Sequence, residues 1–458
     1  MSTETAPTAD ALRDALERRI RAVLGDAVTV SEPTRLTGGA SRETWAFTVT
    51  DPSTGRRDLI LRRDPPGFED PQRMAVEAES FTEALRAGVP VPELVDHSTG
   101  HGRAAAALGS SYLVMDRLPG EALPQRLLRD DRYASVRSAL PYELGRVLAR
   151  IHRMDADAVP GLAGGDQVEQ LFAMYRGTGI RLPVLEIAFR WLRTHRPQTE
   201  RDTVVHGDFR NGNILVDDSG IRAVLDWELV HRGDPMEDLG WLCVKTWRFG
   251  SPLPVGGFGE RADLFRGYED ECGIAPDPES VRWWELYGTL RWAVMCGHQA
   301  NRGLVDGEDN ALELLAIGRR VAECEKDLLD LLGLGHDDAP VPGPEPSTAD
   351  DLFGRPSATE LLGVVREFVR RNAAGGDPQA AYLSRVAANV LGVAAREAAL
   401  GPELRTRHRK ALEAAGFDSE TTLAKALRAG TASADDPAVA HAVRQAAAAR
   451  LAVANPRY

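Results

Sequence analysis

The sequence HGDFRNGNIL at His206–Leu215, followed by AVLDWELVHRGDPMEDL at Ala223–Leu239, decides the fold. Apolar or β-branched runs lie at 203–205, 214–216 and 221–225, and turn-forming residues separate the last two runs. Apolar runs between turn signals are typical of short strands. The stretch is therefore predicted to form short strands that present polar residues at their ends.

Three polar residues of this stretch have a spacing that suits phosphoryl transfer from a nucleotide. Asp208 and Asn213 lie five residues apart in one loop, and Asp226 follows 18 residues after Asp208. A hydroxyl nucleophile needs a carboxylate that orients it and accepts its proton, and the phosphates need hard oxygen ligands that hold Mg²⁺. Asp208 is therefore the candidate base, and Asn213 and Asp226 are the candidate magnesium ligands.

The same stretch resembles the catalytic and metal loops of the aminoglycoside phosphotransferase and choline kinase group, which are relatives of protein kinases. The motifs are His-x-Asp-x-x-x-x-Asn at 206–213, Leu-Asp-Trp-Glu at 225–228 and Asp-Pro-x-x-Asp-Leu at 234–239. The resemblance implies an α+β, bilobal protein-kinase-like fold and the use of ATP or GTP with Mg²⁺. Within the catalytic loop, Arg210 is a further candidate catalytic residue.

A glycine-bearing segment near the N-terminus is the candidate nucleotide-covering loop. Gly38 and Gly39 separate short strand-like segments, and a glycine turn lets backbone N–H groups approach phosphate oxygens. Alone, the glycine pair would predict only a hairpin turn, but its place ahead of the catalytic loop resembles that of the family's loop. Ser41 and Arg42 are the side chains expected to touch phosphate.

The N-terminal part departs from the family pattern at one position. The strand DLILRR at 58–63 stands where kinases keep the lysine that pairs with the α and β phosphates. The chain has only four lysines, and the first is Lys245. Arg62, or less favourably Arg63, is therefore expected to take this role, although an arginine differs from a lysine in reach and geometry. Plain strand-surface charge is the alternative interpretation.

Other elements of the nucleotide site follow from the same resemblance. The next predicted helix carries Glu77 and Glu79, one of which should pair with Arg62, and Glu77 is favoured by its distance from the segment after the helix. At the end of the last predicted strand of this lobe, the backbone of Asp116 and Leu118 is expected to hydrogen-bond adenine.

Composition narrows the class of protein. The chain has 458 residues, 43% hydrophobic and 27% charged residues, and a net charge of −13. An acidic chain is a poor nucleic-acid binder. The sequence has no apolar run of about 18 residues, and residues 1–10 lack the basic and apolar pattern of a signal peptide, so we expect no membrane span, no signal peptide and a cytoplasmic location. The four cysteines are expected to be reduced and mostly buried thiols.

The chain is predicted to contain four segments. These are an N-lobe with an N-terminal helix (1–118), a C-lobe (119–335), a linker rich in Pro, Gly and acidic residues (336–351) and a small all-α bundle (352–458). The bundle resembles a helical domain of unknown function found after such kinases, with helices near 377–399, 403–415, 419–429 and 437–453. Residues 351–458 hold 15 Lys and Arg against 11 Asp and Glu, so their net charge is opposite in sign to that of the acidic remainder. We expect the bundle to fold independently, and it could form a homodimer.

Three functions remain open from the sequence. The pattern Leu-Arg-Arg-x-Pro-Pro-Gly at 61–67, with HGDFRNGN, resembles the kinase-like domains associated with acyl-CoA dehydrogenases. A hydroxy-acyl compound or its CoA thioester is therefore the first expected small-molecule hydroxyl substrate, and an aminoglycoside or other amino alcohol is the second. The third hypothesis is a nucleotide-binding pseudokinase scaffold. The missing lysine favours it, whereas the intact Asp208, Asn213 and Asp226 oppose it.

Overall fold

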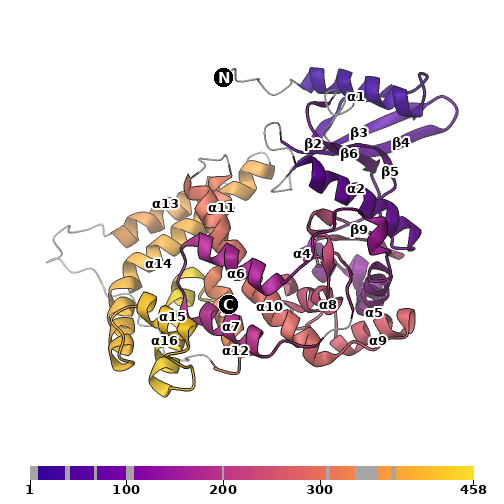
Figure 1. Cartoon of the computed structure of the whole chain (residues 1–458). Helices are drawn as coiled ribbons and strands as arrows, with labels where there is room; N and C mark the ends of the chain where they lie inside the picture. The colour runs from indigo at the N-terminus through magenta and orange to yellow at the C-terminus, as the bar shows by residue number, and fades with distance from the viewer. Residues whose placement is uncertain are drawn as a thin grey trace. The chain divides into compact units, whose positions relative to one another are not determined.

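The computed structural model describes residues 9–36, 42–65, 70–99, 108–198, 201–305, 310–335, 358–372 and 378–458. The chain divides into two compact units (Figure 1). The first unit comprises Met1–Gly165 and Gln198–Glu285, and the second comprises Asp166–Pro197 and Leu286–Tyr458. Each unit is described by itself below.

An antiparallel sheet forms the N-terminal part of the first unit (Figure 1). Its strands follow the order β1-β3-β4-β6-β5, and β2 pairs with β3. Their bounds are β1 (Thr29–Val30), β2 (Thr34–Leu36), β3 (Glu43–Asp51), β4 (Gly55–Arg63), β5 (Leu94–Ser98) and β6 (Tyr112–Asp116). Helix α1 (Ala9–Leu24) buries Leu12, Leu16 and Ile20 against this sheet because residues four apart share one helix face.

Helix α2 (Pro71–Arg86) follows β4 and supplies a buried glutamate to the site. The carboxylate of Asp70 accepts a hydrogen bond from the backbone N–H of Arg73, and Pro71 occupies the first turn. Both features stabilise a helix start. The glutamate is Glu77, which is fully buried.

The rest of the first unit carries the catalytic loop. Strand β7 (Thr203–Val205) pairs with β10 (His231–Gly233), and β8 (Ile214–Asp217) forms a hairpin with β9 (Gly220–Val224). The helices are α4 (Pro124–Arg129), α5 (Ala134–Ile151), α8 (Met236–Cys243) and α9 (Arg261–Cys272). The strands of this region thus appear where the apolar runs predicted them.

The second unit is entirely helical within the residues that the structure describes. Helix α10 (Pro278–Val305) enters it from the first unit. The other helices are α6 (Gln167–Thr178), α7 (Pro183–Thr194), α11 (Ala311–Gly318), α12 (Val321–Leu331), α13 (Ala358–Asn372), α14 (Pro378–Ala414), α15 (Glu420–Ala429) and α16 (Pro437–Ala454).

One expectation for the C-terminal helices was wrong. Separate helices were predicted near 377–399 and 403–415, but α14 is continuous from Pro378 to Ala414 and passes through Pro402. Proline in a helix interior removes a hydrogen bond and crowds the preceding turn. Here Leu400 and Leu404, on either side of the proline, pack in one apolar cluster with Val453 of α16. This packing favours a continuous helix.

The C-terminal helices are joined to α7 and α12 by ion pairs. Arg428 of α15 donates to Glu186 of α7 (Nε–Oε2 2.9 Å), and Arg450 of α16 donates to Glu325 of α12 (Nε–Oε2 2.6 Å). The second unit thus groups these helices with residues 286–335, whereas the sequence analysis placed a boundary at 336–351. Independent folding of residues 352–458 stays a prediction.

The α+β fold predicted from the sequence is confirmed, with a β-rich N-terminal part and a mainly helical remainder. Within the described ranges, none of the helices combines the length and the apolar character that crossing a membrane requires.

We predict that Gly267→Ala destabilises the first unit, because α5 and α9 pack with almost no space between their backbones. A Cβ on Gly267 would lie 2.0 Å from the Tyr142 carbonyl oxygen. Overpacking of this kind costs about 1–3 kcal/mol. Calorimetry should therefore show a lower melting temperature. The control is Gly177→Ala in α6, where a Cβ would meet no atom within 4 Å and alanine favours the helix. Equal melting temperatures of both variants would contradict the close approach.

Candidate active site

The catalytic loop begins at a glycine that no other residue can replace without a clash. Gly207 has φ +78°, and a Cβ there would lie 2.4 Å from the carbonyl oxygen of Leu229. The carboxylate of Asp238 accepts the backbone N–H groups of His206 (2.8 Å) and Gly207 (2.9 Å). The start of the loop is therefore fixed by the third sequence motif.

Asp238 is itself held in a fully buried position. His152 Nε2 lies 3.2 Å from Asp238 Oδ2, and His152 Nδ1 lies 3.0 Å from the hydroxyl of Tyr268. Burial opposes ionisation of Asp238, but the hydrogen bond and charge of His152 hold the pKa of this carboxyl below its ordinary value. Asp238 is therefore a carboxylate. His152 holds it in the position from which it binds the loop backbone.

Asp208 is surrounded by hydrogen-bond donors. Its Oδ1 accepts from Trp241 Nε1 (2.9 Å) and from Arg210 Nε (3.0 Å), and its Oδ2 accepts from Asn213 Nδ2 (2.6 Å). The guanidinium of Arg210 also lies 4.6 Å from the centroid of the Trp247 ring. The structure thus brings together Asp208, Arg210 and Asn213 and orients the carboxylate from several sides.

Trp241 is a residue of this site that the sequence analysis missed. It lies in α8, two residues after the last motif. No residue pattern reveals that its indole N–H points at Asp208. Only the path of α8 past the catalytic loop places the two together.

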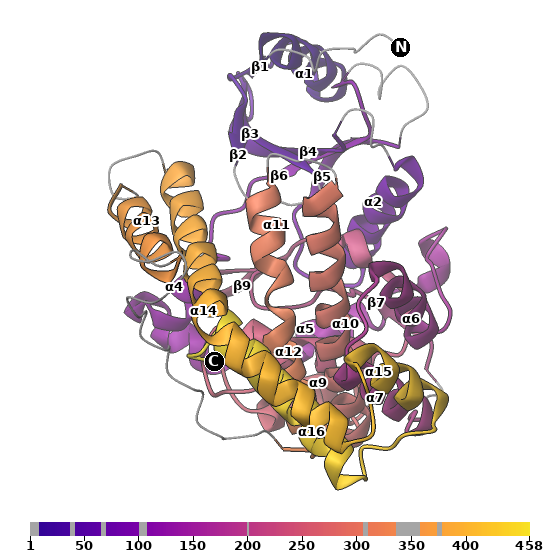
Figure 2. The same cartoon turned by 90° about the vertical axis from the view of Figure 1, so that its left-hand side faces the viewer.

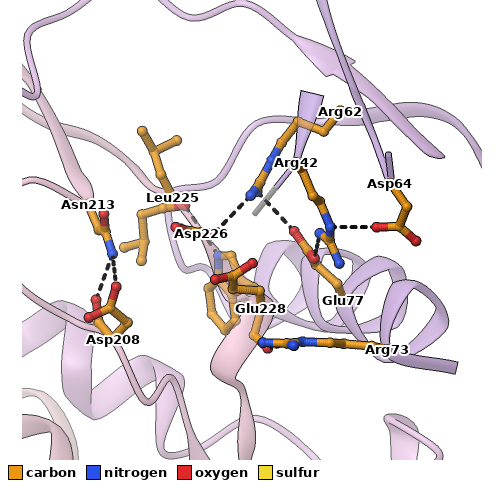
Figure 3. A network of polar contacts seen from close by, with 12 residues as sticks. Arg42, Arg62, Asp64, Arg73, Glu77, Asp208, Asn213, Leu225, Asp226 and Glu228 are labelled. Atoms are coloured by element: carbon orange, nitrogen blue, oxygen red, sulfur yellow. Dashed lines mark hydrogen bonds and ion pairs between the residues drawn. The ribbon is translucent and has the colours of Figure 1, made fainter. Parts of the chain in front are cut away.

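Asp226 occupies an unusual backbone conformation just after β9. Its φ is +66°, in the left-handed region that aspartate and asparagine tolerate better than most other side chains. Its Oδ1 accepts from Arg62 Nη2 at 2.8 Å (Figure 3). Burial opposes ionisation, but the charge of Arg62 and its hydrogen bond hold the pKa of Asp226 below its ordinary value.

The predicted pair between Arg62 and Glu77 is present. Arg62 Nη1 donates to Glu77 Oε1 at 3.0 Å, so one guanidinium links Glu77 of α2 to Asp226 (Figure 3). Arg63 points elsewhere, because its Nε donates to Glu43 (2.6 Å) and its Nη1 to the Leu108 carbonyl (2.9 Å). Of the two candidates at the lysine position, Arg62 is the one that faces Asp226.

Arg42 is buried beside the pair formed by Arg62 and Glu77. Its Nε donates to Asp64 Oδ1 at 3.0 Å, and its Nη1 donates to Glu77 (Figure 3). The side chain is only 4% exposed. The predicted contact of Arg42 with phosphate would therefore require it to leave both carboxylates. Gly38, Gly39 and Ser41 lie outside the described residues.

The segment that is expected to bind adenine begins at Asp116, the last residue of β6. The backbone N–H of Asp116 donates to the carbonyl of Glu93 at 3.0 Å, and the Asp116 carboxylate pairs with Arg57. The backbone N–H of Asp116 is therefore already hydrogen-bonded. An N–H donated to adenine would have to come from Leu118, two residues further along the chain. This part of the nucleotide site stays a prediction.

The residues predicted to hold magnesium offer suitable oxygen atoms. The side-chain hydrogen bonds of Asn213 use Nδ2, which leaves its Oδ1 for a cation, and the ion pair of Asp226 uses Oδ1. In the part of the chain that the structure describes, no group of three or more His, Cys, Asp or Glu residues could hold a metal ion. Two protein oxygens nevertheless fit Mg²⁺, which usually takes its remaining ligands from phosphate and water.

Comparisons with known proteins agree with this geometry. Residues 32–284 match the model of the Phosphotransferase enzyme family, APH, and residues 374–458 match a Domain of unknown function, DUF6285. The chain is similar to mouse Acyl-CoA dehydrogenase family member 10, with 30% identity over 58% of this chain and 26% of the relative. It is also similar to human Acyl-CoA dehydrogenase family member 11, with 27% identity over 40% of this chain and 25% of the relative. The chain thus matches about a quarter of the length of these relatives.

A solved structure supports the fold. It is that of a putative aminoglycoside phosphotransferase from Ralstonia eutropha, with a TM-score of 0.55 and 24% identity. The match covers 71% of this chain and 99% of that chain. At this identity the likeness concerns the fold alone.

We predict that Arg62→Ala weakens ATP binding by roughly ten- to a hundredfold, because a charge-assisted contact in a buried site is worth about 1.5–3 kcal/mol. Calorimetric titration with ATP and Mg²⁺ measures the effect. Arg62→Lys should recover only part of it, because an ammonium cannot reproduce the fork that reaches two carboxylates. Arg56→Ala, on the exposed part of the same strand, is the control. Unchanged ATP affinity in Arg62→Ala would remove Arg62 from the phosphate site.

We also predict that Trp241→Phe lowers kcat about tenfold while the KM for ATP stays the same. Phenylalanine keeps the ring but removes the N–H that orients Asp208, and one such neutral-to-charged bond is worth roughly 1.5 kcal/mol. Steady-state kinetics, with Trp191→Phe as the control, separate the two parameters. A change in the KM for ATP with constant kcat would show that Trp241 acts on nucleotide binding instead.

Proposed function

This chain belongs to the Phosphotransferase enzyme family, and from that premise we propose that it transfers the γ-phosphate of ATP to a hydroxyl group of a small molecule. The observation that carries the proposal is the environment of Asp208. Three donors from Trp241, Arg210 and Asn213 fix its carboxylate, and Asn213 also offers an oxygen for Mg²⁺. Phosphoryl transfer needs a base for the acceptor hydroxyl and ligands for the metal ion. Here the candidate base and a candidate metal ligand are in contact.

The chain's own residues divide the reaction between them. Asp208 orients the acceptor hydroxyl and takes its proton as the oxygen forms a bond to the γ-phosphorus. The bond from that phosphorus to the bridging oxygen breaks, and ADP leaves. Bound Mg²⁺, held by Asn213 and Asp226, supplies positive charge to the phosphate oxygens.

Arg62 is the cation that we assign to the phosphates. Its guanidinium is shared between Glu77 and Asp226. Phosphate oxygens would replace Asp226 as a partner of Arg62, and the Asp226 carboxylate would then be able to hold the metal. Glu77 keeps the guanidinium in place during this exchange.

The proposed acceptor is a hydroxy-acyl compound or its CoA thioester. Two curated relatives carry acyl-CoA dehydrogenase in their names, and they match this chain over 287 and 202 residues. Joining a kinase-like domain to an acyl-CoA dehydrogenase would supply a phosphorylated acyl substrate directly to a second reaction. An amino alcohol is the competing acceptor.

We expect Asp208→Asn to reduce phosphoryl transfer at least about a hundredfold, the usual range for a general base, while ATP still binds. A coupled assay for ADP gives the rate, and calorimetry gives the affinity for ATP. Asp218→Asn, which changes an exposed carboxylate in the β8–β9 turn, serves as the control. Normal turnover by Asp208→Asn would overturn the assignment.

Mass spectrometry of reaction mixtures identifies the acceptor. Each mixture contains the wild-type chain, ATP, Mg²⁺ and one class of acceptor: hydroxy acids, hydroxyacyl-CoA thioesters or aminoglycosides. A phosphorylated hydroxyacyl product supports the proposal, whereas phosphorylation of aminoglycosides alone excludes the acyl acceptor. ATP binding without any product would favour the scaffold hypothesis.

A further inference from the structure

A cavity of about 1010 Å³ lies within the second unit. It is lined by residues of α11, α12, α13 and α14 and by the segment that follows α16. Figure 2 shows α13 and α11 on the two sides of α14, with the C-terminus beside that helix. The cavity lies outside the residues of the candidate active site, and its volume is typical of sites for small molecules.

Positive charge is concentrated in this cavity. Six arginines line it, namely Arg319, Arg320, Arg366, Arg385, Arg396 and Arg457, against the glutamates Glu313, Glu323 and Glu397. Arg319 pairs with Glu397 at 2.6 Å, and Arg320 pairs with Glu323 at 3.0 Å. Among the described residues, none of the other four arginines forms an ion pair with a carboxylate, although the charge of Glu367 acts on Arg366. An excess of cations is unexpected on a chain whose net charge is −13.

Two of these unpaired guanidiniums face the same point. A Cβ placed on Gly392 would lie 3.4 Å from Arg396 Nη1 and 3.6 Å from Arg366 Nη1. Within the described residues, the guanidinium of Arg396 donates to the backbone carbonyls of Val453 and Ala454 and to no carboxylate. Burial and the charges of Arg366 and Arg457 lower the pKa of Arg396. An anionic ligand would stabilise cations held this close, because hydrogen bonds between ionised groups are strong.

The cavity also has apolar walls. Val386, Val390 and Val393 line it on α14. A smaller cavity of about 190 Å³ shares Arg319 and Glu397 with it and is lined by the apolar side chains of Leu404, Ala449 and Val453. An inorganic anion would leave these apolar surfaces uncovered, whereas a ligand with an apolar arm would cover them.

We propose that this cavity binds a phosphate-bearing small molecule with an apolar arm. Arg366, Arg385, Arg396 and Arg457 bind its phosphate groups, and the valine-lined wall receives the arm. Acyl-CoA thioesters and short phospholipids share this chemistry. Either ligand would bind within the second unit and would be distinct from the nucleotide of the candidate active site.

Calorimetric titration of the full chain with CoA, hexanoyl-CoA and dihexanoyl phosphatidic acid tests the proposal. The variant Arg366→Gln/Arg385→Gln removes two exposed cations of the cavity, and Arg370→Gln/Arg371→Gln removes two exposed arginines on α13 that pair with Glu367 instead. Both variants change the net charge equally. The second therefore controls for general electrostatic attraction.

We expect hexanoyl-CoA or the phosphatidic acid to bind the wild type, and hexanoyl-CoA to bind more tightly than CoA. The cavity variant should lose at least about tenfold in affinity, since each charged hydrogen bond contributes that much. The control variant should bind as the wild type does, and ATP affinity should be unchanged in both. If only hexanoyl-CoA or only the phosphatidic acid binds, the result identifies which of the two ligand classes the cavity takes.

Two results would overturn the proposal. One is that none of the three ligands binds at about 1 mM, the weak limit of specific recognition. The other is equal affinity in the cavity variant, the control variant and the wild type, which would place any bound ligand elsewhere. Both variants change exposed side chains, so circular dichroism should show the same folded protein. Because binding is measured without turnover, failure here leaves the proposed reaction untouched.

Discussion

One buried guanidinium connects the parts of the candidate active site. Arg62 extends from the sheet, contacts Glu77 of α2 and reaches Asp226 beyond β9. Burial makes a lone cation costly, and the two carboxylates together outweigh that cost and raise the pKa of Arg62. Arg62 therefore links the strand, the helix and the segment that carries Asp226, and Arg42 is a second cation beside Glu77.

The sequence was sufficient to predict the parts of the site that lie close together along the chain. The spacing of Asp208, Asn213 and Asp226 placed the candidate base and metal ligands near one another because short strands and tight turns leave little freedom between them. The pairing of Arg62 with Glu77 was also predicted, from the resemblance to the family and from the distance of Glu77 to the segment after its helix. Asp238 was recognised in its motif, although its contact with the loop backbone was not.

The contacts that the sequence did not reveal arise from tertiary packing. Trp241 reaches Asp208 only because α8 passes beside the catalytic loop, and Arg42 reaches Glu77 only because β3 lies next to β4. The course of α14 through Pro402 shows the same effect. A local signal for a helix end was overridden by apolar contacts with a helix far along the chain. A contact between two side chains that are far apart along the chain does not produce a periodic pattern in the sequence.

The arginine at the lysine position also changes the chemical reactivity of the site. A lysine amine attacks activated acyl groups when it loses its proton, and thioesters are such groups. A guanidinium keeps its proton at every physiological pH and is a poor nucleophile. The chain has no lysine before Lys245, so the lobe with Arg62 contains no side-chain amine at all. The guanidinium of Arg62 is thus not open to accidental acylation, and amine-directed reagents that label kinases through their lysine would not modify it.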